Sequence, residues 1–155
     1  MSRPEIVANS SPFIALERVG YQHLLPALFE QINIPPAVQN EVFKEQPLPD
    51  WVKVVHLTQP LAPRMTSARL GPGEREAIAL AMELEAEELI LDDLPARRLA
   101  IFLGLNVIGI LGLLLRAKKR GIIPQVQPLM DALYTQEFHI SERLYSGILE
   151  AAGEG

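Results

Sequence analysis

The chain contains no cysteine, and this absence excludes disulfide bonds and every metal site built from thiolate ligands. It fits the reducing environment of the cytoplasm, where we expect the protein to be located. Histidine is also scarce, since the chain has only His23, His56 and His139. No two of them have the spacing that places paired ligands on one helix face, so a histidine-based zinc site is not expected.

The chain also lacks an apolar run long enough to cross a membrane. The stretch 101–115 is shorter than the ~20 apolar residues that a spanning helix needs, and Asn106 and several glycines interrupt it. We interpret it as a helix end, a buried strand and a second helix. Residues 1–5 are not a basic region followed by a long apolar stretch, so a signal peptide is not expected.

An excess of positive charge is missing as well. The formal net charge is −5, so the chain has no overall attraction to nucleic acid or to an anionic membrane. The one basic run, 116–120, has two interpretations: favourable interaction with the C-terminal end of a helix, or contact with a phosphate backbone. There is no Gly-x-Ser-x-Gly motif, and Gly71-Pro72-Gly73 lacks the ending of a phosphate-binding loop.

What the chain does contain is an alternation of short strands and helices. Its 155 residues and 48% apolar content suit one domain, which we assign to 1–155, with a core over about 5–125 and C-terminal helices over 126–155. Apolar runs predict strands at 5–8, 33–34, 51–57, 88–91 and 106–108. Helical patterns predict helices at 12–19, 21–29, 36–44, 74–85, 94–103, 110–120, 126–134 and 141–151, and 59–73 predicts a loop. Such alternation predicts an α/β fold whose mostly parallel sheet is covered on both faces.

Polar residues follow two of the predicted strands. Asn9, Ser10 and Ser11 follow the first strand, and Asp92 and Asp93 follow the fourth. In parallel α/β folds, functional groups gather outside the carboxyl ends of the strands. Carboxylates that gather there commonly hold a hard cation such as Mg²⁺.

Each polar group also has a purely structural interpretation. The serines can cap the following helix, and Asp93 can cap its own. Glu74 and Glu76 fall in the first turn of a helix, whose dipole favours each of them by roughly 0.3–1 kcal/mol. Glu41 can lie on a solvated helix face. These interpretations do not explain why so many polar groups fall at elements expected to share one edge of the sheet.

Four segments together resemble the PIN-domain family, which includes the VapC-like toxin nucleases of toxin–antitoxin pairs. These segments are 7–16, 34–38 with Glu41, 73–81, and 91–93 with Arg97 and Arg98. The resemblance extends over about 5–125, and the terminal helices look like those of a poorly characterised branch of the family. It implies a three-layer α/β/α fold with strand order 3-2-1-4-5. It also implies hydrolysis of RNA phosphodiesters that depends on Mg²⁺ or Mn²⁺.

The resemblance places the acidic residues of the family on particular positions of this chain. The first acid falls on Asn9, whose amide can still ligate a cation but removes one negative charge. The second acid matches Glu41, and the third matches Glu76, with Glu74 as the weaker alternative.

The fourth acid falls on Asp93 or Asp92, and a further family aspartate falls on Pro95, which is a second departure. The resemblance therefore implies three catalytic residues, namely Glu41, Glu76 and Asp93. It implies five metal ligands, namely Asn9, Glu41, Glu76, Asp92 and Asp93. It implies RNA contacts from four residues, namely Ser10, Ser11, Arg97 and Arg98.

Two functions from different classes remain open. The first is a metal-dependent endoribonuclease, the toxin of a toxin–antitoxin pair, with RNA and a cognate antitoxin protein as partners. The second is a catalytically weak or inactive PIN-fold module that binds RNA or a protein. Asn9 favours the second function, so whether the chain is an active enzyme stays open here. We also expect a homodimer, because Leu24, Leu25, Leu28 and Phe29 exceed what one core is expected to cover.

Overall fold

A computed structural model describes residues 4–59 and 69–155 of the chain. This part contains a five-stranded sheet made of β1 (Ile6–Ala8), β2 (Ile32–Ile34), β3 (Val52–Val54), β4 (Glu88–Ile90) and β5 (Val107–Ile108). All neighbouring strands pair in parallel, in the order β3-β2-β1-β4-β5. The predicted α/β fold and strand order are confirmed, and β3 lies at an edge, as expected for 51–57.

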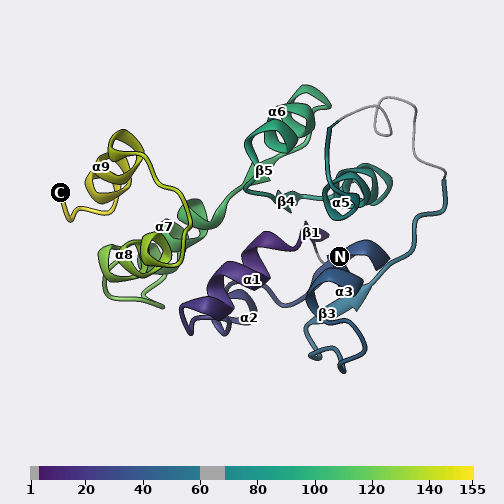
Figure 1. Ribbon diagram of the computed structural model, residues 1–155, viewed down its shortest axis with the longest axis horizontal. Coiled ribbons are helices and arrows are strands. Elements are labelled where there is room, and N and C mark those ends of the chain that lie inside the picture. The colour runs from purple at the N-terminus through teal and green to yellow at the C-terminus, as the bar shows by residue number, and fades with distance from the viewer. Residues whose placement is uncertain (1–3, 60–68) are drawn as a thin grey trace.

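The helices alternate with the strands along the chain (Figure 1). They are α1 (Ser11–Arg18), α2 (Leu24–Leu28), α3 (Pro36–Val42), α5 (Pro72–Glu83), α6 (Leu94–Phe102), α7 (Ile110–Lys119), α8 (Gln127–Thr135) and α9 (Glu142–Ala151). Most predicted ends differ from these by a few residues. The helix predicted at 74–85 begins at Pro72, because proline suits the first turn of a helix. Residues 60–68 of the predicted loop 59–73 lie outside the described residues.

Each face of the sheet has its own apolar core, because successive side chains of a strand point to opposite sides. Ile6 and Ala8 of β1 belong to a buried cluster that includes side chains of α1, α2, α7 and α8. Val7, between them, belongs to a second cluster with side chains of α5 and α6. The sheet is therefore the middle layer of three, with α5 and α6 on one side and α1, α2 and α7 on the other (Figure 1).

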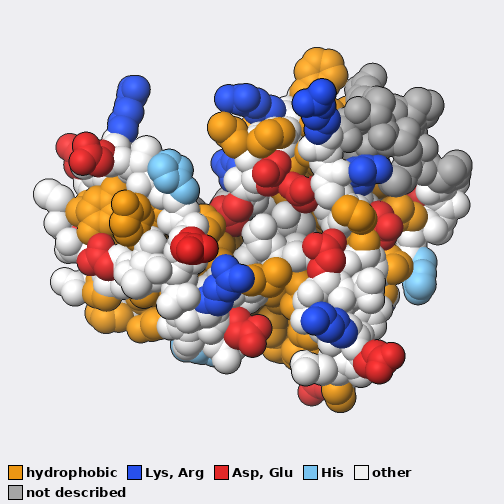
Figure 2. Space-filling model, viewed as in Figure 1, with side chains coloured by type: hydrophobic (Ala, Val, Ile, Leu, Met, Phe, Trp, Pro, Cys, Tyr) orange, Lys and Arg blue, Asp and Glu red, His pale blue; other side chains and the backbone are white. Residues whose placement is uncertain are grey.

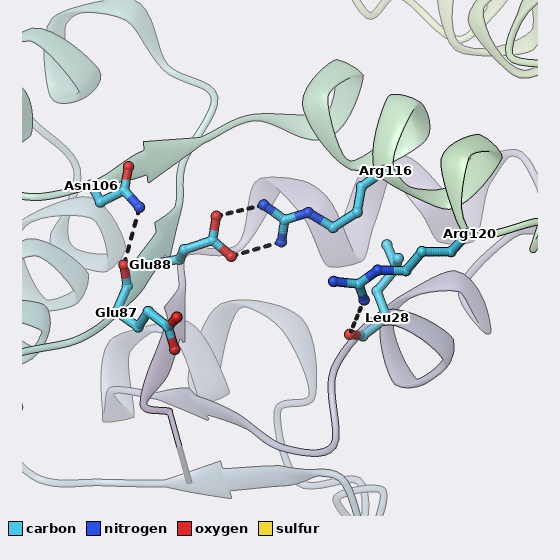
Figure 3. A network of polar contacts seen from close by, with 6 residues as sticks. All are labelled: Leu28, Glu87, Glu88, Asn106, Arg116 and Arg120. Atoms are coloured by element: carbon cyan, nitrogen blue, oxygen red, sulfur yellow. Dashed lines mark hydrogen bonds and ion pairs between the residues drawn. The ribbon is translucent and has the colours of Figure 1, made fainter. Parts of the chain in front are cut away.

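The basic run 116–120 lies at the end of α7 and is largely paired within the chain. Arg116 forms a bidentate ion pair with Glu88 at 2.7 and 2.6 Å. Arg120 donates a hydrogen bond of 3.2 Å to the last carbonyl of α2 (Figure 3). Lys118 pairs with Glu154 at 2.9 Å. These partners support the structural interpretation of the run over contact with a phosphate backbone.

The apolar residues that motivated the expectation of a dimer are covered by their own chain. Leu24, Leu25, Leu28 and Phe29 are at most 8% exposed. They pack in the same cluster as side chains of β2 and α7. The expectation that they exceed one core is therefore wrong, and they offer no surface for a second copy.

No helix within residues 4–59 and 69–155 is long and apolar enough to cross a membrane. The stretch 101–115 is divided among the end of α6, β5 and the first part of α7, as the sequence predicts.

Candidate functional site

The polar residues Asn9, Ser10 and Ser11 follow β1, at the point between β1 and β4 where the strand order of the sheet reverses. β1 and β4 are adjacent parallel strands, and the N–H of Asn9 donates a hydrogen bond of 3.2 Å to the carbonyl of Ile90. Asn9 therefore ends β1 directly beside the end of β4, after which Asp92 and Asp93 follow. The prediction that Asn9 and Asp93 follow adjacent central strands is confirmed.

The side chain of Asn9 is buried with an unused acceptor. Asn9 is 2% exposed, and its Oδ1 atom has no hydrogen-bond partner among the described residues. A buried acceptor left unpaired costs about 1–3 kcal/mol. It needs either a donor or a cation to satisfy it.

Glu41 reaches this edge of the sheet from α3. The hydroxyl of Ser10 donates a hydrogen bond of 3.1 Å to Glu41 Oε2. Ser10 precedes α1 but makes no side-chain cap to it, so its hydroxyl serves Glu41 instead. On the other side, the carboxylate lies against Gly73 in the first turn of α5. Ser11 begins α1 and lines a separate cavity of about 190 Å³ between α1 and α8.

Glu74 is the acid of α5 that faces the cluster. Its Oε1 atom accepts a hydrogen bond of 3.0 Å from the N–H of Gly71, while its Oε2 atom is buried without a partner among the described residues. Burial raises the pKa of Glu74, and the Gly71 hydrogen bond partly offsets this. The charge of Asp93, a side-chain hydrogen bond shared with Asp93 and the charge of Glu41 raise the pKa further. The acids at positions 41, 74 and 93 therefore share one electrostatic environment.

Glu76 has a different partner. Its Oε1 atom accepts a hydrogen bond of 3.1 Å from the N–H of Ala37 in the first turn of α3. The N-cap residue of α3, Pro35, supplies no side-chain cap, so Glu76 satisfies that helix end from α5. Residues two apart on a helix do not share a face. The charges of Asp93 and Glu41 act on Glu74, whereas Glu76 contacts the first turn of α3.

Asp92 contacts the start of α7 with one of its two oxygen atoms. Its Oδ1 atom accepts a hydrogen bond of 2.9 Å from the N–H of Ile110, while its Oδ2 atom is buried without a partner among the described residues. Burial raises the pKa of Asp92, and the Ile110 hydrogen bond and the charge of Arg97 lower it in part. A Cβ placed on Gly109 would lie 2.7 Å from Asp92 Oδ1. The contacts of Asp92 are thus those of a residue that joins β4 to α7.

Asp93 is exposed and caps α6. Its Oδ2 atom accepts a hydrogen bond of 3.1 Å from the N–H of Ala96, as the structural interpretation predicts. Arg97 is partly buried and donates a hydrogen bond of 3.0 Å to the carbonyl of Leu91. Arg98, the next residue, is exposed. Of the two arginines expected to contact RNA, Arg98 is the one whose side chain faces solvent.

The donor atoms at this edge fit a hard divalent cation in their chemistry. Asn9 Oδ1, Glu74 Oε2 and Asp92 Oδ2 are buried and unpaired among the described residues, and oxygen is the ligand that Mg²⁺ and Mn²⁺ prefer. Acidic side chains gather on the molecular surface over the region where β4, α5 and α6 meet (Figure 2). Within residues 4–59 and 69–155, however, no three acidic or histidine side chains form a group that could hold a metal ion. The residues fit in donor type and charge, without forming a closed set of ligands.

Sequence reasoning missed the role of two glycines. Gly73 admits the Glu41 carboxylate, and Gly109 admits the side chains of Asp92 and Arg97. The sequence carried no signal for Gly73, because it falls in the predicted loop 59–73, where glycine is ordinary.

A comparison with protein families gives a match over most of the chain. The family model DUF3368, described as a PIN domain, matches residues 5–154 of the chain. A search of the curated proteins finds no match.

Proposed function

The chain belongs to the PIN-domain family, and from this premise we propose that it is a metal-dependent ribonuclease, the toxin of a toxin–antitoxin pair. The family has a nuclease-type fold, and its members generally use divalent metals. The finer assignment to RNA and to a toxin is our proposal.

One observation carries the proposal. Three buried side-chain oxygen atoms, Asn9 Oδ1, Glu74 Oε2 and Asp92 Oδ2, have no hydrogen-bond partner among the described residues. Glu74 is next to two further acids, Glu41 and Asp93, whose charges raise its pKa. Acceptors that repel one another at the carboxyl ends of central strands are the arrangement that a divalent cation stabilises.

We assign the metal ligands to Asn9, Glu41, Glu74 and Asp93. Relative to the expectation from sequence, Glu74 replaces Glu76, whose carboxylate accepts a hydrogen bond from α3. Asp92 holds the start of α7 through Oδ1, but its Oδ2 is buried and unpaired among the described residues, so Asp92 stays a further candidate ligand.

When bound, Mg²⁺ or Mn²⁺ neutralises charge on the scissile phosphate and lowers the pKa of the attacking water. The residues of the chain orient the participants. Ser10 orients Glu41 by its hydrogen bond, and Arg97 supports the backbone after β4. Arg98 is exposed on α6 and supplies a charge for the RNA backbone. Ser11, at the start of α1, is a further proposed RNA contact.

The alternative function is a catalytically weak or inactive module that binds RNA or a protein. Asn9 favours this alternative, since an amide in place of an acid removes one negative charge from the cluster. The two functions differ in a measurable property, which is cleavage that requires a divalent cation.

The proposal includes a cognate antitoxin, a cytoplasmic location and a homodimer. The buried residues of α2 do not supply the dimer surface. The large apolar side chains of α6, Leu94 and Ile101, are 55% and 59% exposed and are the surface that we assign to it. Sedimentation of the wild-type protein and of Ile101→Glu across a range of concentrations tests the dimer.

The experiment that tests the function is cleavage of single-stranded RNA with Mn²⁺, with Mg²⁺ and with EDTA. We expect cleavage that EDTA abolishes and that Glu74→Gln abolishes, while Glu76→Gln retains it. Retained metal-dependent cleavage in Glu74→Gln would contradict the ligand assignment. RNA binding without any cleavage, in both the wild type and Asn9→Asp, would establish the alternative function.

A further inference from the structure

We propose that Gly73 is a positioning residue, whose missing side chain allows the Glu41 carboxylate to lie between the end of β1 and the first turn of α5. The consequence for metal binding rests on the proposed function. The position of the carboxylate does not, because it follows from contacts within the chain.

The contact between Gly73 and Glu41 leaves no room for a side chain. A Cβ placed on Gly73 would overlap Glu41 Oε1, and it would lie 3.1 Å from Cδ and 3.4 Å from Oε2 of the same carboxylate. All three atoms belong to the flexible end of Glu41, and no backbone atom is among the nearest neighbours. An alanine at position 73 would therefore displace the carboxylate and leave the fold in place.

A second contact fixes the carboxylate from the opposite side. Ser10, which follows β1, donates its hydroxyl to Glu41 Oε2 at 3.1 Å. Glu41 is otherwise an exposed residue on α3, so a long side chain is ordered by one hydrogen bond and one close approach. Gly73 directly precedes Glu74 in the first turn of α5. The first turn of α5 therefore helps to position both Glu41 and Glu74.

Helix propensity does not account for a glycine at this position. Gly73 is the second residue of α5 and is buried, and alanine would form the helix more readily. A positive φ does not account for it either. The described glycines with a positive φ are Gly20, Gly104, Gly121 and Gly153, and Gly73 is not one of them. The close approach of Glu41 is the remaining physical reason for the absence of a side chain.

The first measurement is Mn²⁺ binding by calorimetry, on the wild type, Gly73→Ala and a matched control, Gly147→Ala. Gly147 lies within α9, and a Cβ there would meet nothing within 4 Å. We expect Gly73→Ala to weaken Mn²⁺ binding at least tenfold, since the site loses one carboxylate. The melting temperature of Gly73→Ala should stay close to that of the wild type, because the helix propensity gained with alanine offsets the lost hydrogen bond from Ser10. Gly147→Ala should leave Mn²⁺ binding unchanged.

The second measurement needs no metal. Ser10→Ala removes the hydrogen bond to Glu41 and should lower the melting temperature of the wild type in EDTA by about 2–4 °C. In the Gly73→Ala background the carboxylate has already moved, so Ser10→Ala should lower the melting temperature no further. Such non-additivity is expected of residues that act on one shared partner.

Two outcomes overturn the proposal. One is that Ser10→Ala lowers the melting temperature equally in the wild-type and Gly73→Ala backgrounds, which would show that Glu41 stays in place when position 73 is alanine. The other is wild-type Mn²⁺ affinity in Gly73→Ala. If the wild-type protein binds no Mn²⁺, the proposed function fails, and the metal-free measurement alone decides whether Gly73 positions Glu41.

Discussion

Asp92, which follows β4, accepts the backbone N–H of Ile110 at 2.9 Å and so holds the first turn of α7. The N-cap residue of α7 is Gly109, which has no side chain to cap the helix. A Cβ at Gly109 would lie 2.7 Å from Asp92 Oδ1. A carboxylate that follows β4, the strand paired with β5, thus takes the place of a local cap for α7.

Asp92→Ala should lower the free energy of unfolding by about 1–3 kcal/mol, because the Ile110 N–H loses its buried acceptor. Asp92→Asn should cost less, since its carbonyl can still accept and since burial raises the pKa of Asp92, which disfavours the charged form. Urea unfolding measures both variants. A large loss of Mn²⁺ affinity in Asp92→Asn at unchanged stability would identify Asp92 as a metal ligand.

Glu74 and Glu76 form a matched pair of acids on one helix. Glu74→Gln should reduce Mn²⁺ affinity at least tenfold, because it removes one of the few charges in the cluster. Glu76→Ala should leave Mn²⁺ affinity unchanged and lower stability by about 1 kcal/mol, as loss of a helix cap does. Calorimetry and urea unfolding on the two variants check this. If Glu76→Ala instead weakens Mn²⁺ binding and Glu74→Gln does not, Glu76 is the metal ligand, as the sequence predicted.

The raised pKa of Glu74 predicts a pH dependence in the metal-free protein. The folded chain binds the Glu74 proton more tightly than the unfolded chain, for which the ordinary value is 4.5. Between the ordinary and the raised pKa, stability therefore falls as pH rises, and at higher pH the charged carboxylate remains a constant cost. Glu74→Gln should thus be more stable than the wild type at neutral pH in EDTA. In thermal melts at decreasing pH, the difference in melting temperature between Glu74→Gln and the wild type should become smaller. A difference that does not change with pH would show that the charge of Glu74 is not its cause.

The sequence predicted the fold well because its signals were local. The alternation of apolar runs with helical patterns marked each strand and helix, and the polar residues Asn9 and Asp93 marked the ends of β1 and β4. Contacts between side chains of different helices and strands could not be predicted from such local patterns. Glu74 and Glu76 are two residues apart in one helical turn, and only the packing of α5 against α3 decides which of them faces Asp93.

The dimer argument failed for a related physical reason. A count of apolar residues in the chain does not say how much surface the C-terminal helices cover. Side chains of α7 and α8 share the cluster that buries Leu24 and Phe29, so no apolar surplus remains there. Large exposed apolar residues lie elsewhere, including Leu94 and Ile101 on α6 and also Met82, Tyr134 and Leu144 on three other helices.

Glu154 joins three elements near the C-terminal end of the chain. Its side chain accepts the N–H groups of Val126 and Gln127, at 2.7 and 3.1 Å, and pairs with Lys118 at 2.9 Å. Its burial acts to raise its pKa, but the hydrogen bonds and Lys118 outweigh this and lower it overall. A lowered pKa gives stability that is present above the ordinary value of 4.5 and is lost as pH falls through the folded value.

Glu154→Gln should therefore lower the melting temperature at neutral pH, and the difference from the wild type should shrink in acid. Glu150→Gln on α9 is the matched control, since none of the hydrogen bonds at α8 involves it. Melts of the three proteins over a pH series measure the effect. An equal loss at every pH would show that the charge of Glu154 is not what stabilises this end of the chain.

Asn9→Asp tests whether the unpaired amide oxygen marks the metal site. The position is 2% exposed, so a new carboxylate there gains little from solvent and adds repulsion toward the acids at positions 41, 74 and 93. In EDTA the variant should melt below the wild type. With Mn²⁺ the order should reverse, because a cation bound only by the folded state adds about 2.7 kcal/mol at a hundredfold excess over its dissociation constant. Mn²⁺ should bind more tightly than Mg²⁺ to the same oxygen ligands, and any RNA cleavage should increase. Thermal melts titrated with each metal decide the matter. If Mn²⁺ shifts neither protein, Asn9 is a structural residue and the chain is the binding module of the alternative function.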